Sequence, residues 1–496
     1  MAKKKVALAL SGGVSLGSYI AGALDELLLA LEADGGYEID VITGASAGAT
    51  TAAILAYWLL FGGPNTRLHD VWVKQADMHR LLDPACPPDQ PLTVLSNAWL
   101  TEIASRTLAW PEGSPTPRRS GLCADQLTIA MTITNIEGLS YTARVQMLAA
   151  EREEPLVQRR HAEMEAFTFF ESIKPTDPIW RRVGEVAIAS AALPLIFPPS
   201  KLARRAEPIE TDDYLQQFFV QPPELGDQAE ATLLYSDGGI FNNLPIDLAW
   251  HFARDKDTDQ RIMIIVDPSR DAITPLDMRK PEQRPAYANP LHYLKALFGA
   301  LRAESSAIQF QREVLLTSQE SGSPRDLRGS LPGVDRPPVE ILHDIAVVMP
   351  QASDRRLLGS YLGLALSAFL DERLREYDFR RGAADARTLA NTTLHLPAVA
   401  GRSPSFYKPN EDTTIAISLP TYEQLGGIIS SHDRDLPVGQ RRSVRTVFEA
   451  DLHARLNALI DRMPLPGPAW LYGWLARPLA RWLAWRKLRA ALPRQW

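Results

Sequence analysis

The first sixty residues alternate between uninterrupted apolar runs and segments whose apolar side chains recur with helical spacing. The runs at 6–10 and 39–43 are typical of strands that are buried on both faces. The segments at 19–31 and 49–60 are predicted to be helices, because small and apolar residues recur there with the helical period. Short connections join these four segments. The pattern therefore predicts a parallel, right-handed strand–helix–strand unit and an α/β fold.

Later apolar runs extend the predicted sheet. Three of them have the length of core strands, at 127–135, 233–236 and 262–266. Three other segments lack this pattern and are predicted to be insertions, near 83–120, 148–182 and 200–230. The first is rich in proline, the second is charged and predicted to be helical, and the third is polar, acidic and loop-like. Together these patterns predict one core domain over residues 1–275.

The pattern changes after this core domain. Helical spacing continues through 290–314 and 355–377, and the segment 321–338 between them is rich in helix-breaking residues. These features predict a mainly helical extension over residues 276–460. The final segment, 461–496, is predicted to be a separate tail, because it combines basic residues with tryptophan.

The composition is that of an ordinary globular protein. Of the 496 residues, 45% are hydrophobic and 23% are charged, which is sufficient for a sizeable core. The net charge of -6 does not favour binding to nucleic acid. Only two cysteines occur, Cys86 and Cys123, so the chain has neither a disulfide framework nor the CxxC spacing of a metal site. We expect a reducing compartment.

The N-terminus resembles a signal peptide only over its first few residues. Three lysines at 3–5 precede an apolar run, but Ser11, Gly12 and Gly13 end that run too early for a secretory segment. No stretch reaches the roughly 18 uninterrupted apolar residues that a membrane-spanning helix needs. We therefore expect a cytoplasmic protein.

Residues 44–48 read Gly-Ala-Ser-Ala-Gly and match the pattern G-x-S-x-G. A nucleophilic serine at a sharp strand-to-helix turn needs very small neighbours two positions away, and Gly44 and Gly48 supply them. The helix that begins after Ser46 would direct its positive end towards the site and favour developing negative charge. The alternative is a plain turn of small residues. The strand predicted before this segment and the apolar helix after it favour the nucleophile.

A glycine-rich loop over 11–17 follows the first predicted strand and precedes a helix. Its backbone N–H groups can converge on an anion, such as the oxyanion of a tetrahedral acyl intermediate. A nucleotide-phosphate loop is the alternative. However, Val14 stands where a dinucleotide fingerprint has its middle glycine, and the Gly-Lys-Ser/Thr of a P-loop is absent. The candidate nucleophile on the next strand favours the oxyanion interpretation.

Asp237 follows the predicted strand at 233–236 and precedes Gly238 and Gly239. Two glycines let this aspartate approach another strand end closely, although Asp-Gly is also a common turn. A Ser–Asp dyad needs one carboxylate within hydrogen-bond reach of the serine and no histidine. The alternative Ser-His-Asp fold of the α/β-hydrolases places several strands before its elbow, whereas only one strand–helix unit precedes Gly44. None of the nine histidines stands in a typical late loop, so the dyad is favoured.

Four segments resemble, in order, the motifs of the patatin-like phospholipase family. The first is Leu-Ser-Gly-Gly-Val-Ser-Leu-Gly at 10–17, and the second is Gly-Ala-Ser-Ala-Gly at 44–48. The third is Ala-Ser-Ala-Ala-Leu-Pro at 189–194, followed by Phe-Pro-Pro at 197–199. The fourth is Asp-Gly-Gly-Ile-Phe-Asn-Asn-Leu-Pro at 237–245. The resemblance covers about the first half of the chain.

The resemblance implies a patatin-like α/β core, with a parallel sheet and helices on both faces, over residues 1–275. Ser46 would be the nucleophile and Asp237 the base, and the N–H groups of Gly13 and Val14 would form the oxyanion hole. The other motif positions are six glycines, Gly12, Gly17, Gly44, Gly48, Gly238 and Gly239. The family uses no metal and no cofactor, so we expect neither here.

The implied activity is that of a serine carboxylic-ester hydrolase in lipid metabolism. It would resemble phospholipase A or lysophospholipase and act on phospholipids or other lipid esters through an acyl-enzyme. Two departures motivate an alternative: Val14 replaces the usual third glycine, and Leu16 replaces the usual Arg or Lys, as in a bacterial subgroup called patatin-related proteins. The alternative is a lipid-binding or scaffold protein with weak or no activity. A general carboxylesterase for small soluble esters is a third possibility.

The tail is the candidate for contact with a membrane. From position 462 onward it contains seven Lys or Arg residues, no Asp or Glu, and five of the 11 tryptophans of the chain. An amphipathic helix over 479–492 would place basic side chains against anionic head groups and its Trp and Leu side chains in the interface. The alternative is that these tryptophans pack against the protein. We expect peripheral contact with the inner membrane surface through 464–496.

Overall fold

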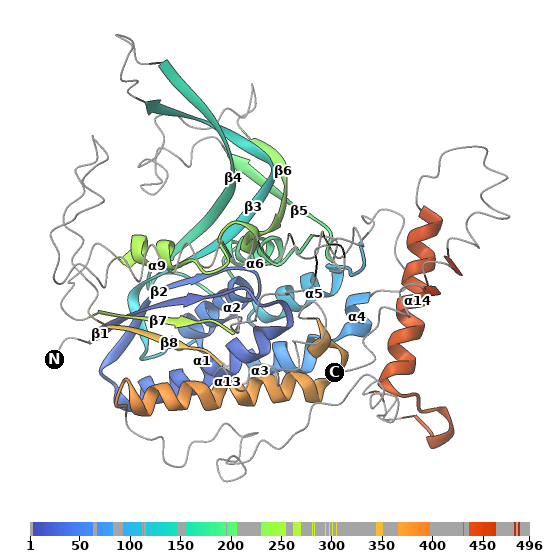
Figure 1. The fold of residues 1–496 in the computed structure, drawn as a ribbon. Helices are drawn as coiled ribbons and strands as arrows, with labels where there is room; N and C mark the ends of the chain where they lie inside the picture. The colour runs from blue at the N-terminus through green and yellow to red at the C-terminus, as the bar shows by residue number, and fades with distance from the viewer. Residues whose placement is uncertain are drawn as a thin grey trace.

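The computed structural model describes most of the chain. Its described residues are 3–62, 67–82, 93–145, 154–205, 230–253, 261–268, 344–350, 366–396 and 436–462, except 112, 114, 115 and 195, together with a few isolated positions elsewhere. They form a mixed β-sheet that is covered by helices on both faces (Figure 1).

The sheet has eight strands within the described residues, in the order β5-β6-β3-β2-β1-β7-β8, with β4 paired to β3. The strands are β1 (Lys4–Leu10), β2 (Tyr37–Gly44), β3 (Cys123–Val145), β4 (Glu154–Phe169), β5 (Ser200–Arg205), β6 (Glu230–Asp237), β7 (Arg261–Val266) and β8 (Asp344–Val348). The five strands from β3 to β8 in this order are parallel to one another. The other three, β4, β5 and β6, run antiparallel to their neighbours. The five apolar runs predicted as strands all lie within these elements.

Alternate residues of β1 face opposite layers of helices, as the two-residue period of a strand requires. Leu8 and Leu10 lie in the large core with α1 (Gly17–Asp34) and α2 (Ala47–Phe61). Ala9 points the other way and packs with the helix α9 (Ile246–Ala253). The predicted α/β fold with helices on both faces is therefore confirmed.

Shorter helices and the C-terminal helices complete the described structure. They are η1 (Val14–Leu16), α3 (Arg67–His69), the π-helix η2 (Asp70–Gln75), α4 (Met78–Leu82), α5 (Ala98–Thr107), α6 (Ile179–Ser190), η3 (Gly238–Ile240), η9 (Ser367–Leu370), α13 (Glu372–Thr392), η13 (Val438–Gln440) and α14 (Val444–Arg462).

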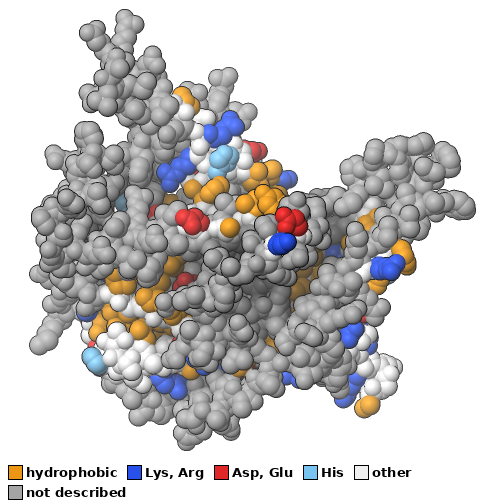
Figure 2. All heavy atoms as spheres, in the orientation of Figure 1, with side chains coloured by type: hydrophobic (Ala, Val, Ile, Leu, Met, Phe, Trp, Pro, Cys, Tyr) orange, Lys and Arg blue, Asp and Glu red, His pale blue; other side chains and the backbone are white. Residues whose placement is uncertain are grey.

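The prediction of a helical insertion at 148–182 is wrong over most of its length. Strand β4 occupies Glu154–Phe169 and forms a long antiparallel hairpin with β3. The charged residues that suggested a helix instead bond to side chains of other elements. Glu163 accepts from Arg204 of β5 at 2.8 Å, and Glu165 accepts from Arg182 of α6 at 2.7 Å. Figure 2 shows Lys and Arg side chains over this part of the molecule.

The sheet continues beyond residue 275, where we predicted the end of the core. Strand β8 pairs in parallel with β7, and α13 runs along α1 beneath the sheet (Figure 1). The extension predicted for 276–460 therefore shares the sheet and the core of the N-terminal part. Of the helix predicted at 355–377, residues 355–365 lie outside the described residues. The described remainder contains η9 (Ser367–Leu370) and the start of α13 at Glu372.

Several predicted segments lie largely outside the described residues. Only isolated positions are described within 290–314, and none within 321–338. Of the tail at 461–496, the structure describes 461, 462, 481, 482, 485 and 486.

One described helical run, Val14–Asp34, is long and apolar enough to cross a membrane. However, 89% of its most apolar window is buried inside the protein. Two glycines bring this helix against α13. A Cβ at Gly22 would lie 1.8 Å from the carbonyl oxygen of Phe379, and a Cβ at Gly382 would lie 2.0 Å from that of Tyr19. The Tyr19 hydroxyl also donates to Asp385 at 2.8 Å.

Candidate active site

Ser46 stands at the turn between β2 and α2, at the carboxyl edge of the parallel strands. Its φ of 52° and ψ of -120° lie outside the common regions for an L-residue. Both flanking glycines are required by close packing. A Cβ at Gly44 would lie 2.5 Å from the carbonyl carbon of Gly48, and a Cβ at Gly48 would lie 2.3 Å from the carbonyl oxygen of Leu10. The local sequence thus permits a sharp turn that directs the serine hydroxyl away from the sheet.

The Ser46 hydroxyl donates to Oδ2 of Asp237 at 2.7 Å. Both residues are buried, at 4% and 3% exposure, so little water competes for this hydrogen bond. Oδ1 of Asp237 accepts the backbone N–H of Gly239 at 2.7 Å, which fixes the plane of the carboxylate. The sequence placed these two residues 191 positions apart, and the fold brings them into direct contact.

The glycines after Asp237 fit the crowded space where β6 meets β3. A Cβ at Gly238 would lie 2.0 Å from the carbonyl oxygen of Thr132, and a Cβ at Gly239 would lie 2.6 Å from Oδ1 of Asn243. The carbonyl of Asp237 accepts from the hydroxyl of Thr134 at 2.8 Å. This network holds the aspartate at the strand end, where the hydroxyl of Ser46 meets it.

The glycine-rich loop lies beside the dyad. The N–H of Gly12 donates to the carbonyl of Asn243 at 2.9 Å, and a Cβ at Gly12 would lie 3.0 Å from Cβ of Ser46. Within the described residues, the N–H groups of Gly13 and Val14 donate to no protein acceptor. They are therefore available to an oxyanion. Gly17 closes the loop against Trp72, whose ring would lie 2.3 Å from a Cβ at that position.

Val14 has a φ of 54°, in the left-handed region that favours glycine. The departure noted in the sequence therefore falls on a position whose backbone conformation suits the missing glycine. Leu16, the second departure, is 4% exposed and packs in the large core. An apolar side chain is thus buried where the family usually has a cation.

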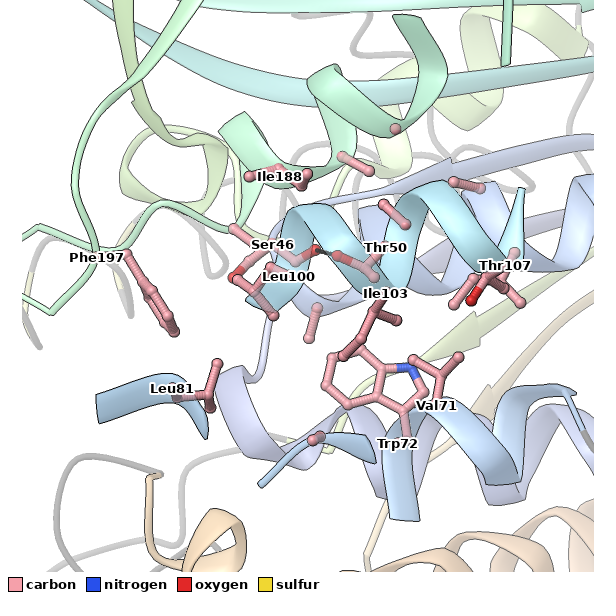
Figure 3. Close-up of a pocket in the computed structure, with 18 of the residues that line it drawn as sticks. Ser46, Thr50, Val71, Trp72, Leu81, Leu100, Ile103, Thr107, Ile188 and Phe197 are labelled. Carbon is pink, nitrogen blue, oxygen red and sulfur yellow. Dashed lines mark hydrogen bonds between the residues drawn. The ribbon is translucent and has the colours of Figure 1, made fainter. Parts of the chain in front are cut away.

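An apolar pocket opens beside Ser46 (Figure 3). Its volume is about 80 Å³, measured by where the centre of a water molecule can lie. One water needs roughly 10–15 Å³ on that measure, so the pocket can hold a chain of several atoms. The hydroxyl-bearing residues on its wall are Ser46, Thr50 and Thr107, and almost all the others are apolar.

The pocket follows one face of α2. Ser46, Thr50 and Ile54 line it at helical spacing, which gives a path of about 12 Å along the helix axis. Other walls come from Trp72 of η2 and from α5 and α6. Phe369 of η9, which lies far beyond the N-terminal half, also lines it. Trp72 and Phe369 could not be found from the sequence, because no local pattern marks a pocket wall that several distant elements build.

Ser190 is a further site residue to which no role was assigned from the sequence. It lies within the third motif, at the end of α6, and its hydroxyl accepts the backbone N–H of Ser46 at 2.8 Å. Three of the histidines bond to partners elsewhere: His69 to Glu376, His79 to Asp451, and His161 to the carbonyl of Asn135. Among the described residues, no group of three or more His, Cys, Asp or Glu side chains could hold a metal ion.

Comparison with known proteins identifies a family for the N-terminal half of the chain. The family model for Patatin-like phospholipase matches residues 8–250. A search of curated proteins finds no match. The crystal structure of VipD from Legionella pneumophila is similar over 92% of this chain and 75% of that chain, at 13% sequence identity and a TM-score of 0.34. The match over 8–250 spans all four motifs, and this part of the chain is a domain of the patatin-like phospholipase family.

Proposed function

We propose that this protein is a lipid acyl hydrolase that uses Ser46 as nucleophile and Asp237 as general base. The single observation that carries the proposal is the 2.7 Å hydrogen bond between their side chains, beside an apolar pocket that Ser46 lines. A buried serine that donates to a carboxylate is in position to lose its proton as it attacks.

The reaction proceeds in two stages. In the first, Oγ of Ser46 attacks the ester carbonyl while its proton passes to Asp237, and the oxyanion accepts from the N–H groups of Gly13 and Val14. Collapse of this intermediate breaks the ester bond, and the leaving alcohol takes the proton from Asp237. In the second stage Asp237 removes a proton from water, which attacks the acyl-enzyme. The acid is released and Ser46 recovers its proton.

The pocket favours a lipid ester over a small soluble ester. An acyl chain lying along α2 would leave water and pack against apolar walls, with a gain of about 0.8 kcal/mol for each buried methylene. A phospholipid or lysophospholipid is therefore the proposed substrate class. A general carboxylesterase would show no such dependence on chain length.

Variants of the dyad test the proposal. We expect Ser46→Ala and Asp237→Asn each to lower kcat on a lipid ester by about a thousandfold or more, because the two act as a unit. Asp247→Asn is the matched control, since its carboxylate accepts from Asn242 outside the dyad, and it should retain activity. Fluorophosphonate labelling of Ser46 checks the nucleophile directly. Wild-type protein that hydrolyses no ester and is not labelled would favour the lipid-binding scaffold.

We further propose that the protein is cytoplasmic and that its tail makes peripheral contact with an anionic membrane. Trp482 is 54% exposed and lies under the guanidinium of Arg486, at 5.2 Å. Trp485 instead packs against the core and the ring of His453, at 4.8 Å. Sedimentation with anionic vesicles should therefore weaken in Trp482→Ala. Equal binding by this variant and the wild type would contradict the role of Trp482.

A further inference from the structure

The turn at Ser46 needs support from outside itself. A non-glycine residue at φ 52° and ψ -120° is strained by roughly 1–3 kcal/mol, and such a conformation persists only where surrounding contacts hold it. Ser46 is also the N-cap of α2, and its side chain accepts no hydrogen bond from the first turn of that helix. The side chain is committed to Asp237, so the backbone of Ser46 must be held by another group.

The hydroxyl of Ser190 meets that need. It accepts the N–H of Ser46 at 2.8 Å, and Ser190 is fully buried at 0% exposure. Water therefore has no ready access to replace it. Without this hydroxyl the N–H of Ser46 would be a buried donor with no partner, which is costly inside a protein.

The same end of α6 also holds the base. The carbonyl of Ala192 accepts the backbone N–H of Asp237 at 2.9 Å and the hydroxyl of Ser236 at 2.8 Å. Two residues of one short segment thus bond to the backbones of both members of the dyad. The segment coincides with the third sequence motif, which has no role in the proposed reaction.

The helix that carries this segment is itself firmly anchored. Trp180, near its start, packs edge-on against Tyr57 and Phe61 of α2, with ring centroids 4.9 and 5.5 Å apart. The indole N–H of Trp180 donates to the carbonyl of Lys174 at 3.0 Å. Because α6 is packed against α2, the helix that follows Ser46, its C-terminal end is a fixed reference for the dyad.

We propose that Ser190 is a positioning residue, which together with the carbonyl of Ala192 holds Ser46 and Asp237 at the separation that proton transfer requires. The inference rests on the proposed Ser–Asp chemistry and extends it to the third motif. Ser190 touches no reacting atom. It acts through the backbone of the nucleophile.

Steady-state kinetics of Ser190→Ala test this role. We expect kcat on a soluble 4-nitrophenyl ester to fall about tenfold or more, with KM within about twofold of the wild type, because the pocket is intact and only the dyad is misplaced. Ser190→Thr keeps a hydroxyl and should restore most of kcat. Should the alanine variant fail to fold, Ser190→Cys offers a weaker acceptor of similar size and should show an intermediate kcat.

Ser120→Ala is the matched control. The hydroxyl of Ser120 likewise accepts a backbone N–H, that of Leu122 at 3.2 Å, at the opposite end of α2. It should lose stability without loss of kcat. If Ser190→Ala, or Ser190→Cys in its place, keeps the wild-type kcat, or if Ser120→Ala loses kcat equally, the positioning role is wrong.

A crystal structure of the Ser190→Ala variant separates this inference from the proposed function. We expect Ser46 to leave its φ of 52° and its hydroxyl to move beyond hydrogen-bond distance of Asp237. An unchanged dyad in that crystal would overturn the inference whether or not the wild type hydrolyses esters. Absence of wild-type hydrolysis and labelling would overturn the proposed function alone.

Discussion

At the scale of single residues, Val14 is a β-branched residue in a backbone conformation that favours glycine. A β-branched residue at φ 54° is costly by about 1–3 kcal/mol. Val14→Gly removes that strain. It also raises the conformational entropy of the unfolded chain, which lowers stability by roughly 0.5–1 kcal/mol. We expect a net gain of about 1 kcal/mol and a higher Tm in thermal unfolding. Val14→Ala keeps a Cβ in the same conformation and should give no gain. A lower Tm for the glycine variant would show that the valine is not strained.

A second residue-scale prediction concerns Asp25, which is partly buried on α1 and has no hydrogen-bond or ion-pair partner among the described residues. Burial, and then the nearby charge of Glu26, raise its pKa from 3.8 to about 7. Because the folded pKa lies above the unfolded one, the folded state binds the extra proton between these values. The stability linked to Asp25 is therefore greatest at low pH and falls as pH rises towards 7.

Replacement of Asp25 by Asn should remove this dependence. We expect Asp25→Asn to stabilise the protein by about 2–4 kcal/mol at pH 8 and by much less at pH 5, as measured by urea unfolding at both values. Glu26→Gln is a contrasting variant, because Glu26 pairs with Arg387 at 2.8 Å and should lose stability when neutralised. Equal effects of Asp25→Asn at the two pH values would contradict the raised pKa.

The candidate dyad could be proposed from residues because its chemistry has a local signature. Gly44, Gly48, Gly238 and Gly239 mark two crowded turns at strand ends, and strand ends of one parallel sheet meet at one edge. Ser190 could not be found this way. A serine in the last turn of an amphipathic helix looks like any other buried serine until the fold shows the N–H that it accepts.

At the scale of elements, the pairing of α1 with α13 depends on close backbone contact. A Cβ at Gly22 would lie 1.8 Å from the backbone of Phe379, so α13 would have to shift. We expect Gly22→Ala to destabilise the protein by about 2 kcal/mol or more, since overpacking of this kind costs roughly 1–3 kcal/mol. Gly121→Ala is the control, because a Cβ there meets nothing within 4 Å. The measurement is the midpoint of chemical denaturation for both variants. Equal midpoints would mean that α1 and α13 do not pack so closely.

Strands that are buried on both faces could be predicted from the sequence. The prediction failed for β4, which carries charged residues. Runs such as 6–10 and 262–266 are apolar because helices cover both sides of the sheet. Strand β4 carries charged residues, such as Glu163, that bond to Arg204 of a distant strand. Periodicity alone cannot distinguish such a strand from a solvated helix, because the partner that neutralises each charge is set by the fold.

At the scale of the whole molecule, the site is completed by the part of the chain that sequence patterns had separated from it. The family match ends at residue 250, yet Phe369 lines the pocket beside Ser46. The element that carries it, η9, leads directly into α13, which packs on α1. The C-terminal part therefore supplies both a pocket wall and support for α1, the helix that follows the glycine-rich loop. Residue patterns could not reveal this, because the contact joins positions more than 300 apart.

Removal of the Phe369 ring tests whether this wall binds the acyl chain. Loss of part of an apolar contact is worth about 1 kcal/mol, so we expect Phe369→Ala to raise KM for a long-chain ester roughly fivefold. The kcat for 4-nitrophenyl acetate should stay unchanged, since that substrate does not reach the wall and the dyad is not altered. Phe448→Ala is the matched control, because Phe448 packs on the same core from α14 without lining the pocket. It should lower Tm and leave the KM for the long-chain ester at its wild-type level. If the two variants change this KM equally, Phe369 does not contact the acyl chain, and the C-terminal part only stabilises the fold.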